Sequence, residues 1–314
     1  MAQRKVTVKD LARICGVSIG TIDRAINDRG GINPGTKKKI LEAARANGFV
    51  KNQTALSLSS GRPTLIGVII TALNNEFQTT MLTAIEEEAR RRGFSTLIML
   101  SGFDEETEFA ALDRMLSMSV AGIITFSVAR DAGRYLRLSE TLPVVAVGNR
   151  IDGRIPFVGI DDRAAMRAGT KFVAGRGYDR LVYVAPLLER EGTQNMRAQI
   201  RRRDGFLDAV RESGVRCEMI DSYEKYNGLS SYVGVGRMAF VCSSDVYTVR
   251  CLPFRSDSVG VMGFDRLGMI GSLVPDLSGV VYPTSEIGRS AVSVLLDGGE
   301  DMILPYETVE GGTV

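Results

Sequence analysis

The sequence of 314 residues contains no histidine and no tryptophan, and the absence of histidine excludes several kinds of chemistry. A Ser-His-Asp triad or a Cys-His pair needs an imidazole as general base, and catalytic zinc sites commonly use histidine ligands. The sequence also shows no nucleotide-binding loop and no paired nucleophile and base. We therefore expect no enzymatic activity, no metal and no cofactor.

Cysteine is scarce as well. Cys15, Cys217, Cys242 and Cys251 form no Cys-x-x-Cys pair, which is typical of reduced thiols in a cytoplasmic protein. The longest apolar run covers only residues 65–70, far short of a membrane span. The N-terminus is charged and lacks the apolar segment of an export signal. We expect a cytoplasmic protein without a membrane partner.

The net charge of +2 combines two unlike parts. Residues 1–62 contain twelve lysines and arginines but only four acidic residues, which gives this segment a charge of +8. The remaining 252 residues hold 27 basic and 33 acidic side chains and carry a charge of −6. A basic segment joined to an acidic body indicates that the basic end binds a polyanion, with a solvated basic surface as the alternative.

The basic segment has the pattern of three short helices. Thr7 and Ser18 are expected to cap the first two helices, and Gly16-Val17 forms the tight turn between them. Asn33-Pro34 is typical of the cap and first position of a third helix. The residues expected on the inner face of the first helix are Val8, Leu11, Ala12 and Ile14. This pattern predicts an all-α helix-turn-helix head, whose second helix enters the major groove of DNA.

The head resembles the DNA-binding domain of the lactose-repressor (LacI/GalR) family. The residues that carry the resemblance are Thr7, Val8, Lys9, Asp10, Leu11, Ala12, Gly16, Val17, Ser18, Thr21, Ile22, Arg24 and Asn27. The resemblance implies a domain over residues 1–50 that binds double-stranded operator DNA. The DNA contacts that it implies are Thr7, Ser18, Ile19, Gly20, Thr21, Arg24 and Asn27.

Within the second helix, the resemblance places Ile19, Gly20 and Arg24 near base edges. Arg24 can bind guanine with two hydrogen bonds, Ile19 can contact only a thymine methyl, and Gly20 has no side chain to read a base. Asp23 stands where the family usually has a phosphate-contacting serine, so we expect it to repel phosphate or to pair with Arg24. Ile22 is expected in the core, which is also the alternative for Ile19.

Residues 51–63 form a short polar linker rich in serine. The residues that resemble the family's hinge helix, which becomes ordered on operator DNA, are Asn52, Ala55, Ser57 and Leu58. The resemblance implies that Leu58 inserts into the central minor-groove step, where the bend offsets an unstacking cost of roughly a few kcal/mol. Leu56 stands where the family usually has an arginine, which removes that minor-groove contact. A flexible linker is the alternative.

From residue 64 onward, apolar runs of strand length alternate with amphipathic helical stripes. The expected strands cover residues 65–70, 96–100, 122–126, 143–147, 158–161, 181–185, 238–241 and 259–264. The repetition of strand and helix predicts parallel sheets with helices on both faces, and two such runs predict two lobes. We expect an N-lobe of residues 64–159 and 284–305 and a C-lobe of residues 160–283.

This body resembles the family's effector domain, which is similar to periplasmic sugar-binding proteins. The segments that carry the resemblance are residues 66–68, 120–124, 158–162, 205–206, 263–265 and 286–289. With the head, the resemblance extends over essentially the whole chain. It implies an effector-binding and dimerisation domain over residues 64–314, whose ligand lies between the lobes near the carboxyl ends of strands.

The positions that match the family's ligand pocket are Asn75, Phe77, Arg202, Ser244, Asp245 and Asp265. Carboxylates accept hydrogen bonds from hydroxyl groups and a guanidinium donates them, so this set suits a neutral carbohydrate or polyol. The alternatives are that Asp245 caps a helix, that Asp265 pairs structurally and that Phe77 belongs to the core. A neighbouring arginine of the run 201–203 is the alternative for Arg202.

Two connections in the C-lobe are shorter than the family pattern. They cover residues 221–238 and 245–259, and both adjoin the proposed ligand carboxylates. The C-lobe is therefore either trimmed or has a remodelled cleft that binds no sugar.

The sequence as a whole predicts a transcriptional regulator, a repressor that binds a pseudo-palindromic operator as a homodimer under the control of a small effector. A regulator whose body dimerises without sensing a sugar is the first alternative. A solute-binding protein and an enzyme are more remote, because the chain has a helix-turn-helix and no histidine.

Overall fold

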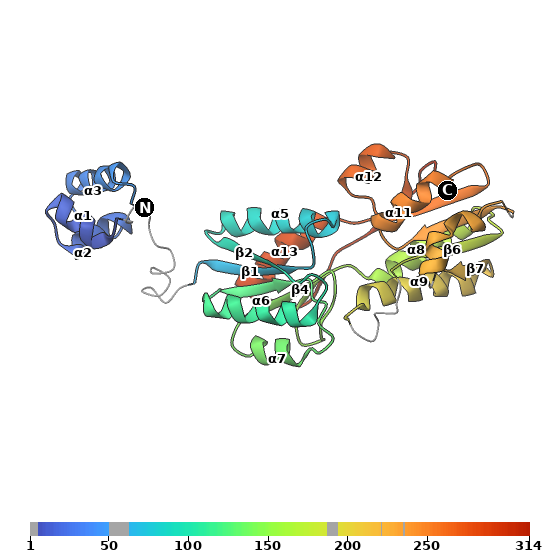
Figure 1. Cartoon of the computed structure of the whole chain (residues 1–314), viewed down its shortest axis with the longest axis horizontal. Helices are drawn as coiled ribbons and strands as arrows, with labels where there is room; N and C mark the ends of the chain where they lie inside the picture. The colour runs from blue at the N-terminus through green and yellow to red at the C-terminus, as the bar shows by residue number, and fades with distance from the viewer. Residues whose placement is uncertain (1–5, 50–62, 187–193, 221, 235) are drawn as a thin grey trace. The chain divides into compact units, whose positions relative to one another are not determined.

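The computed structural model describes residues 6–49, 63–186, 194–220, 222–234 and 236–314. The chain divides into two units, Met1–Arg62 and Pro63–Val314 (Figure 1). Each unit has its own apolar core. No helix within the described ranges is both long and apolar enough to cross a bilayer.

The first unit consists of three helices, each preceded by a side-chain cap. They are α1 (Val8–Cys15), α2 (Ile19–Ile26) and α3 (Pro34–Ala46). Thr7, Ser18 and Asn33 accept hydrogen bonds from backbone amides of the first turns, which have no acceptor inside the helix. Gly16 ends α1 with a φ of 65°, a left-handed conformation that glycine adopts without strain. The predicted caps and turn of the helix-turn-helix are confirmed.

One apolar side chain from each helix forms the centre of this unit. Leu11, Ile22 and Ile40 are at most 1% exposed and lie in one cluster. The sequence predicts Ile14 on the same inner face, but this prediction is wrong, because Ile14 is 48% exposed. The neighbouring Cys15 packs against the cluster instead, and one residue along a helix turns a side chain by about 100°.

The N-lobe of the body is a parallel sheet with helices on both faces. Its strand order is β11-β5-β4-β3-β1-β2. The strands are β1 (Leu65–Ile70), β2 (Ser95–Leu100), β3 (Gly122–Thr125), β4 (Val144–Val147), β5 (Phe157–Gly159) and β11 (Met302–Ile303). Helices α5 (Glu76–Arg91) and α13 (Thr284–Asp297) pack on one face, and α6 (Glu105–Ser117) and α7 (Gly133–Ser139) on the other (Figure 1). This arrangement buries β1 on both sides and explains its continuous apolar run.

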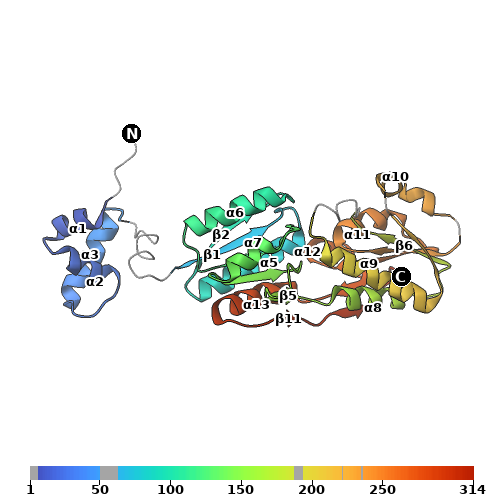
Figure 2. The same cartoon turned by 90° about the horizontal axis from the view of Figure 1, so that it is seen from below.

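The C-lobe contains a second sheet of six strands in the order β12-β10-β9-β8-β6-β7. The strands are β6 (Arg180–Val184), β7 (Arg216–Met219), β8 (Met238–Cys242), β9 (Val259–Asp265), β10 (Ser278–Val281) and β12 (Glu307–Val309). The helical elements are α8 (Asp162–Ala174), α9 (Arg197–Ser213), α10 (Tyr223–Asn227), η2 (Leu229–Tyr232), α11 (Asp245–Cys251), η3 (Leu252–Phe254) and α12 (Gly268–Leu273). Helices α8 and α9 lie side by side along this lobe (Figure 2). The predicted two-lobed α/β fold is confirmed.

Strand β12 departs from the prediction of purely parallel sheets. It runs antiparallel to β10, with Val309 opposite Gly279. The chain leaves the N-lobe after β11 and returns to the C-lobe, so this last strand enters the sheet from the opposite end. Strands β7, β10, β11 and β12 were absent from the expected set because each has at most four residues and no long apolar run.

The two C-lobe connections, where described, contain only short helical elements. Between β7 and β8 the described residues form only the five-residue helix α10 and the four-residue η2. Between β8 and β9 they form α11 of seven residues and η3 of three. The lobe therefore keeps its sheet and has small helical elements on this face.

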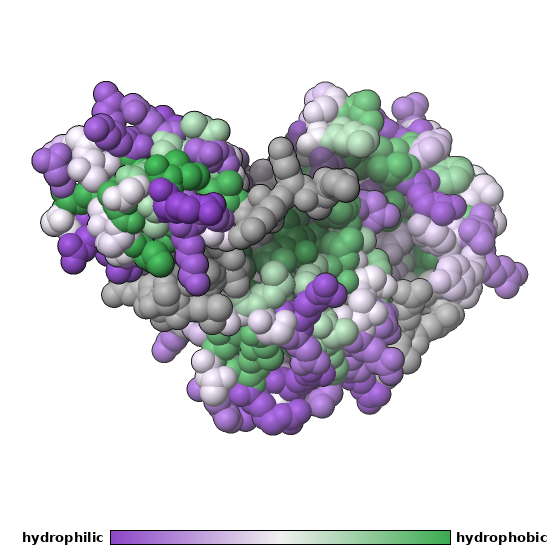
Figure 3. All heavy atoms as spheres, turned by 60° about the vertical axis from the view of Figure 1, so that its left-hand side comes forward, coloured by the Kyte–Doolittle hydropathy of each residue, from purple (hydrophilic) through white to green (hydrophobic). Residues whose placement is uncertain are grey.

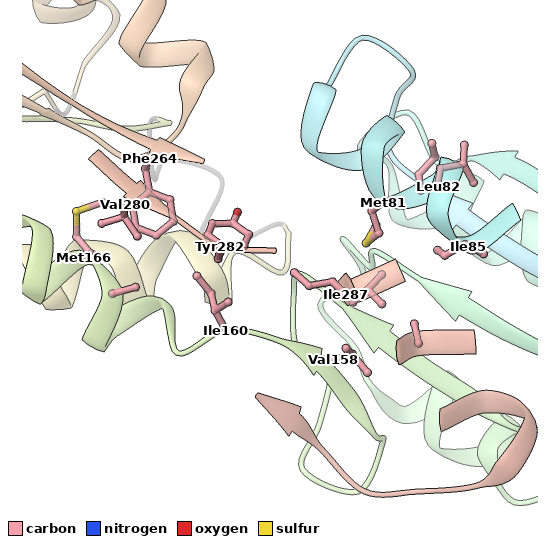
Figure 4. Close-up of a cluster of buried hydrophobic side chains, with 14 of the residues drawn as sticks. Met81, Leu82, Ile85, Val158, Ile160, Met166, Phe264, Val280, Tyr282 and Ile287 are labelled. Atoms are coloured by element: carbon pink, nitrogen blue, oxygen red, sulfur yellow. The ribbon is translucent and has the colours of Figure 1, made fainter. Parts of the chain in front are cut away.

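The largest apolar cluster of the body contains buried residues from both lobes. Figure 4 shows Met81, Ile85 and Ile287 of the N-lobe helices in the same cluster as Phe264 and Tyr282 of the C-lobe. The apolar cluster thus continues from one lobe into the other.

On the face shown in Figure 3, hydrophilic side chains occupy much of the surface and hydrophobic ones form smaller patches.

Two glycines allow helices to approach closely. A Cβ atom at Gly205 of α9 would overlap the carbonyl oxygen of Arg163 in α8. A Cβ atom at Gly288 of α13 would overlap the carbonyl oxygen of Met81 in α5. Because both obstacles are backbone atoms, these helix pairs depend on the absence of a side chain.

Candidate DNA-binding and ligand-binding sites

Helix α2 leaves all three predicted base-reading positions exposed. Ile19 is 50% exposed, and Gly20 and Arg24 are exposed too. Arg24 has no ion-pair partner among the described residues. Ile22 is fully buried, as predicted. The alternative that placed Ile19 in the core is wrong, and its side chain is accessible to a partner.

Two of the predicted DNA contacts act as helix caps. Ser18 Oγ accepts a hydrogen bond from the Thr21 amide at 3.1 Å and lies 2.9 Å from Thr21 Oγ1. The Thr7 amide donates to Asp10 Oδ2 at 3.0 Å, and Thr7 Oγ1 accepts from the Asp10 amide at 3.3 Å. Thr7 and Ser18 therefore use their side chains to fix the starts of α1 and α2.

Asp23 does not pair with Arg24. Its Oδ2 lies 3.2 Å from Arg29 Nη1, and its Oδ1 accepts a hydrogen bond from Asn27 Nδ2 at 2.6 Å. Asn27 lies one turn beyond Asp23, and Arg29 follows the end of α2, so both reach the carboxylate more readily than its direct neighbour. The pairing leaves the Arg24 guanidinium available and holds Asn27 at the end of the helix.

The remaining basic residues of the head differ in accessibility. Lys37 forms an ion pair with Asp28, whereas Lys38 and Lys39 are exposed. Leu58, the predicted minor-groove wedge, lies outside the described residues.

In the body, Arg202 is the buried member of the arginine run. It is 7% exposed and donates from Nε to Asp162 Oδ1 at 2.7 Å and from Nη1 to the Ser243 carbonyl oxygen at 2.6 Å. Its Nη1 also lies 3.6 Å from Asp265 Oδ1, and its guanidinium stacks 3.9 Å from the centre of the Phe264 ring. The guanidinium thus connects the start of α8, the residue that follows β8 and the end of β9.

Asp265 ends strand β9 in an unusual conformation. Its φ is 93°, in the left-handed region that costs energy for a residue with a side chain. Its carboxylate accepts a hydrogen bond from the Tyr282 hydroxyl and faces Arg202. Burial raises the pKa of Asp265, and the charge of Arg202 opposes this increase. The structure holds a buried carboxylate in a strained position at the carboxyl end of a strand.

Asp245 fixes the loop that precedes α12. Its Oδ1 accepts from the Arg266 amide at 3.1 Å and its Oδ2 from the Leu267 amide at 2.7 Å. Burial and the charge of Asp265 raise the pKa of Asp245 to about 7. Ser244, not Asp245, is the N-cap of α11, and its side chain makes no capping hydrogen bond. The alternative of Asp245 as a helix cap is therefore wrong.

Phe77 is half-buried among aromatic rings. Its ring centre lies 6.2 Å from that of Phe126 and 6.1 Å from that of Tyr282, in edge-to-face arrangements. Asn75 caps α5 by accepting a hydrogen bond from the Gln78 amide at 3.2 Å. Through Tyr282, Phe77 of the N-lobe is linked to Asp265 of the C-lobe.

The two lobes are also joined by hydrogen bonds. Glu76 Oε1 accepts from the Met269 amide at 3.0 Å. Asn149 Oδ1 accepts from the Ala198 amide at 3.1 Å, and Asn149 Nδ2 donates to the Asn195 carbonyl oxygen at 2.6 Å. These bonds hold the ends of α5, α9 and α12 near the predicted ligand residues.

The structure thus brings Phe77, Arg202, Asp245 and Asp265 into one linked group. Sequence reasoning missed Tyr282 in this group, because nothing in its local sequence signals a partner for a distant carboxylate. It also missed the buried partner of Arg202, Asp162, although the segment 158–162 that carries the family resemblance contains it. The group contains aromatic rings, one guanidinium and several carboxylates. Aromatic rings can stack on the apolar face of a ligand, and the charged groups can form hydrogen bonds with its hydroxyl groups.

Comparison with protein families agrees with this fold. The family model described as periplasmic binding proteins and sugar binding domain of LacI family matches residues 64–229. A second, described as periplasmic binding protein-like domain, matches residues 170–310.

Individual relatives match along nearly the whole chain. The HTH-type transcriptional regulator RegA of Clostridium saccharobutylicum is 27% identical over 308 residues, which cover 92% of this chain and 91% of RegA. Catabolite control protein A of Priestia megaterium is 27% identical over 307 residues, with 92% and 91% coverage. The lac repressor dimer bound to operator and the anti-inducer ONPF has a TM-score of 0.82 at 18% identity over 99% of each chain, which shows a shared fold.

A helix-turn-helix head joined to a two-lobed body of this fold defines a class of DNA-binding regulators. The family model covers more than half of the chain, and the chain belongs to the LacI family of transcriptional regulators. The relatives named above are regulators and not enzymes, in agreement with the expectation from the missing histidines.

Proposed function

We propose that this protein is a transcriptional repressor whose affinity for operator DNA is set by a small sugar or polyol bound between the lobes. The observation that carries the proposal is the linked group of Phe77, Tyr282, Asp265 and Arg202, which contains residues of both lobes. A ligand that contacts such a group favours one arrangement of the lobes. It shifts DNA binding by its difference in affinity for the two arrangements.

The head is proposed to bind operator DNA through Arg24, Ile19 and the capped start of α2. Arg24 supplies discrimination for guanine, because its guanidinium is exposed and has no ion-pair partner among the described residues. Thr7, Ser18, Thr21 and Asn27 are proposed to support contacts with the backbone. The division into a head of residues 1–50, a linker of 51–63 and a body of 64–314 is part of this proposal.

We propose a homodimer, since the lac repressor, which shares this fold, is a dimer when it is bound to its operator. Helices α11 and α12 support this proposal with apolar side chains that are open to solvent. Val246 and Val249 of α11 are each 56% exposed, and Met269 and Leu273 of α12 are 69% and 74% exposed. Apolar side chains spaced three or four residues apart form a face on each helix that a second copy can cover. A regulator that binds DNA acts where the DNA is, so we place it in the cytoplasm.

Selection from random double-stranded DNA tests the DNA-binding part. The full chain should enrich a pseudo-palindrome whose half-sites lie about one helical turn apart. Mobility shifts should then show preference for that sequence over shuffled DNA. If the folded, dimeric protein enriches no sequence, the result would contradict the proposal.

A thermal-shift screen with sugars and polyols tests the ligand part. A true effector at 100 times its Kd should stabilise the fold by about 2.7 kcal/mol and change operator affinity. Asp265→Asn is the matched variant and should lose both effects. Operator binding without any stabilising ligand would favour the alternative, in which the body only dimerises.

A further inference from the structure

Helix α2 carries a carboxylate on the face that points away from the core of the head. Ile22 of this helix is fully buried, whereas Ile19, Gly20 and Arg24 are exposed. Asp23 lies one turn after Ile19, and its side chain is 42% exposed. Residues three or four positions apart are neighbours on a helix surface, so Asp23 shares the face on which we propose that DNA binds.

A carboxylate on a DNA-binding face needs a compensating charge, because the phosphates of DNA are negative. Arg29 supplies this charge. Its Nη1 atom lies 3.2 Å from Asp23 Oδ2, and its side chain is 57% exposed. The two charges largely cancel, so Asp23 can come close to DNA without the repulsion that an unpaired carboxylate would meet.

The turn after α2 brings Arg29 back to this carboxylate. Asp28 has a φ of 53°, a left-handed conformation, and the Arg29 amide donates a hydrogen bond to the Arg24 carbonyl oxygen at 2.9 Å. This pattern reverses the chain at the end of a helix. Lys37 of α3 forms an ion pair with Asp28 and links the turn to α3. The backbone of Arg29 therefore lies beside the last turns of α2.

Asn27 orients the other oxygen of the carboxylate. Its Nδ2 atom donates to Asp23 Oδ1 at 2.6 Å, while Oδ2 faces Arg29. A carboxylate has about four positions at which it can accept a hydrogen bond, so these two contacts leave room for a further donor. They also hold the side chain in one orientation, which lowers the entropy that is lost when it binds a partner.

Gly20 leaves space beside the carboxylate. Side chains of a helix lean toward its N-terminus, so the Asp23 side chain extends toward Gly20, three residues earlier. Apart from its chain neighbours and the backbone of its helix, the nearest described atom to a Cβ at Gly20 is Ser18 Oγ, at 3.7 Å. The space next to the carboxylate is therefore open, and the edge of a base can reach it.

We propose that Asp23 determines part of the operator sequence by accepting a hydrogen bond from the amino group of a cytosine in the major groove. Cytosine presents only its N4 amino donor there, whereas adenine presents its amino group beside the N7 acceptor, which repels a carboxylate. Arg24, the next residue of α2, can bind guanine. The exposed face of α2 therefore combines an acceptor for cytosine with a donor for guanine.

Two forms of the operator test this contact. Selection from random double-stranded DNA should give the wild-type protein a half-site with a fixed cytosine. Thymine has an acceptor, O4, where cytosine has its amino group, so replacing this cytosine by thymine should weaken wild-type binding about tenfold or more in mobility shifts. Asp23→Ala cannot distinguish the two bases. The affinities of this variant for the two operators should agree within about threefold, and its guanine preference should remain.

Three further variants separate the base contact from general effects. Asp23→Asn keeps the shape of the side chain, and its amide can accept from cytosine or donate to thymine, so its affinities should also agree within about threefold. Glu42→Gln removes an exposed acid of α3 and, as a matched control, should keep the wild-type ratio. Arg29→Gln should weaken binding to both operators and to random DNA by similar factors, because Asp23 then lacks its compensating charge.

This inference rests on the proposed DNA binding, and the experiment distinguishes their failures. If the folded, dimeric wild-type protein enriched no sequence, both would be overturned. A selected half-site without a fixed cytosine, or a cytosine preference that persists in both Asp23 variants, would overturn the base contact alone. Stronger binding of all three DNAs by Arg29→Gln would overturn the compensating role of Arg29.

Discussion

Arg202 donates a hydrogen bond from Nε to Asp162 Oδ1 at 2.7 Å, and both side chains are less than a tenth exposed. Asp162 is the first residue of α8, where the helix dipole favours a carboxylate. The pair therefore joins the start of one helix to the middle of the neighbouring helix. Arg202 Nη1 also lies 3.6 Å from Asp265 Oδ1, so the pair adjoins the predicted ligand residues.

Removing one partner of this buried pair should be costly. Asp162→Ala leaves the Arg202 guanidinium without its carboxylate and should lower the free energy of unfolding in urea by about 3–5 kcal/mol. Adding Arg202→Met should restore part of the loss, because the buried guanidinium is then gone and the carboxyl of Asp265, whose pKa burial already raises, can take up a proton. Arg211→Ala removes an exposed pair with Asp208 and should cost less than about 1 kcal/mol. If Asp162→Ala and Arg211→Ala lowered the free energy of unfolding equally, the Asp162–Arg202 pair would contribute no more than an exposed pair, which would contradict this prediction.

The carboxyl of Asp245 should make stability depend on pH. Burial and the charge of Asp265 raise its pKa to about 7, whereas an unfolded aspartate has a pKa of about 3.9. The folded state therefore holds this proton more tightly, so its contribution to stability is present at low pH and is lost as the pH rises through 7.

Asp245→Asn removes this titration. The difference in free energy of unfolding between wild type and variant should fall from about pH 5 to about pH 8 in the absence of ligand. Urea denaturation at a series of pH values measures it. A difference that stays constant or rises over this interval would show that Asp245 titrates normally.

Helix packing should be sensitive to one methyl group at Gly205. The added Cβ of Gly205→Ala meets the Arg163 backbone, which cannot rotate away, so the variant should lose about 1–3 kcal/mol or more. Gly153→Ala is the control, because no atom lies within 4 Å of its added Cβ. Thermal unfolding of both variants measures the effect, and a harmless Gly205→Ala would mean that α8 and α9 pack less closely.

Arg24 should determine sequence preference, and Lys38 should contribute only charge. Arg24→Ala should cost about 1–3 kcal/mol on the selected operator and much less on random DNA. Lys38→Ala should weaken both, and if Lys38 neutralises a phosphate, the slope of log K against log salt becomes shallower by about 0.9. Mobility shifts at several salt concentrations separate the two effects. Equal losses on both DNAs for Arg24→Ala would remove it from base recognition.

Leu58 carries the prediction for the linker. Leu58→Ala removes the apolar wedge, so it should weaken binding to the selected operator while binding to random DNA stays nearly unchanged. Ser57→Ala is a neighbouring control that keeps the wedge. Parallel losses on both kinds of DNA would refute insertion into the minor groove.

Elements whose signals are local could be predicted from the sequence. The caps Thr7 and Ser18 lie next to the helices that they start, and the left-handed turn needs only Gly16. The long apolar strands could also be predicted, because burial on both faces of a parallel sheet requires an unbroken apolar run. The exposure of Ile14 shows that the buried face of a short helix cannot be predicted from its own sequence alone, since the partner helices decide which face is covered.

The assembly of the candidate ligand site depends on contacts between residues far apart in the sequence. Arg202 reaches Asp162 across 40 residues of sequence, and Tyr282 reaches Asp265 across 17. No local pattern reveals that Arg202 is buried while the neighbouring Arg201 is exposed. Local sequence specifies a residue's backbone conformation and capping, whereas long-range packing decides which charges lose water and become paired. The +8 head was therefore evident from the sequence, and the linked charges of the body were not.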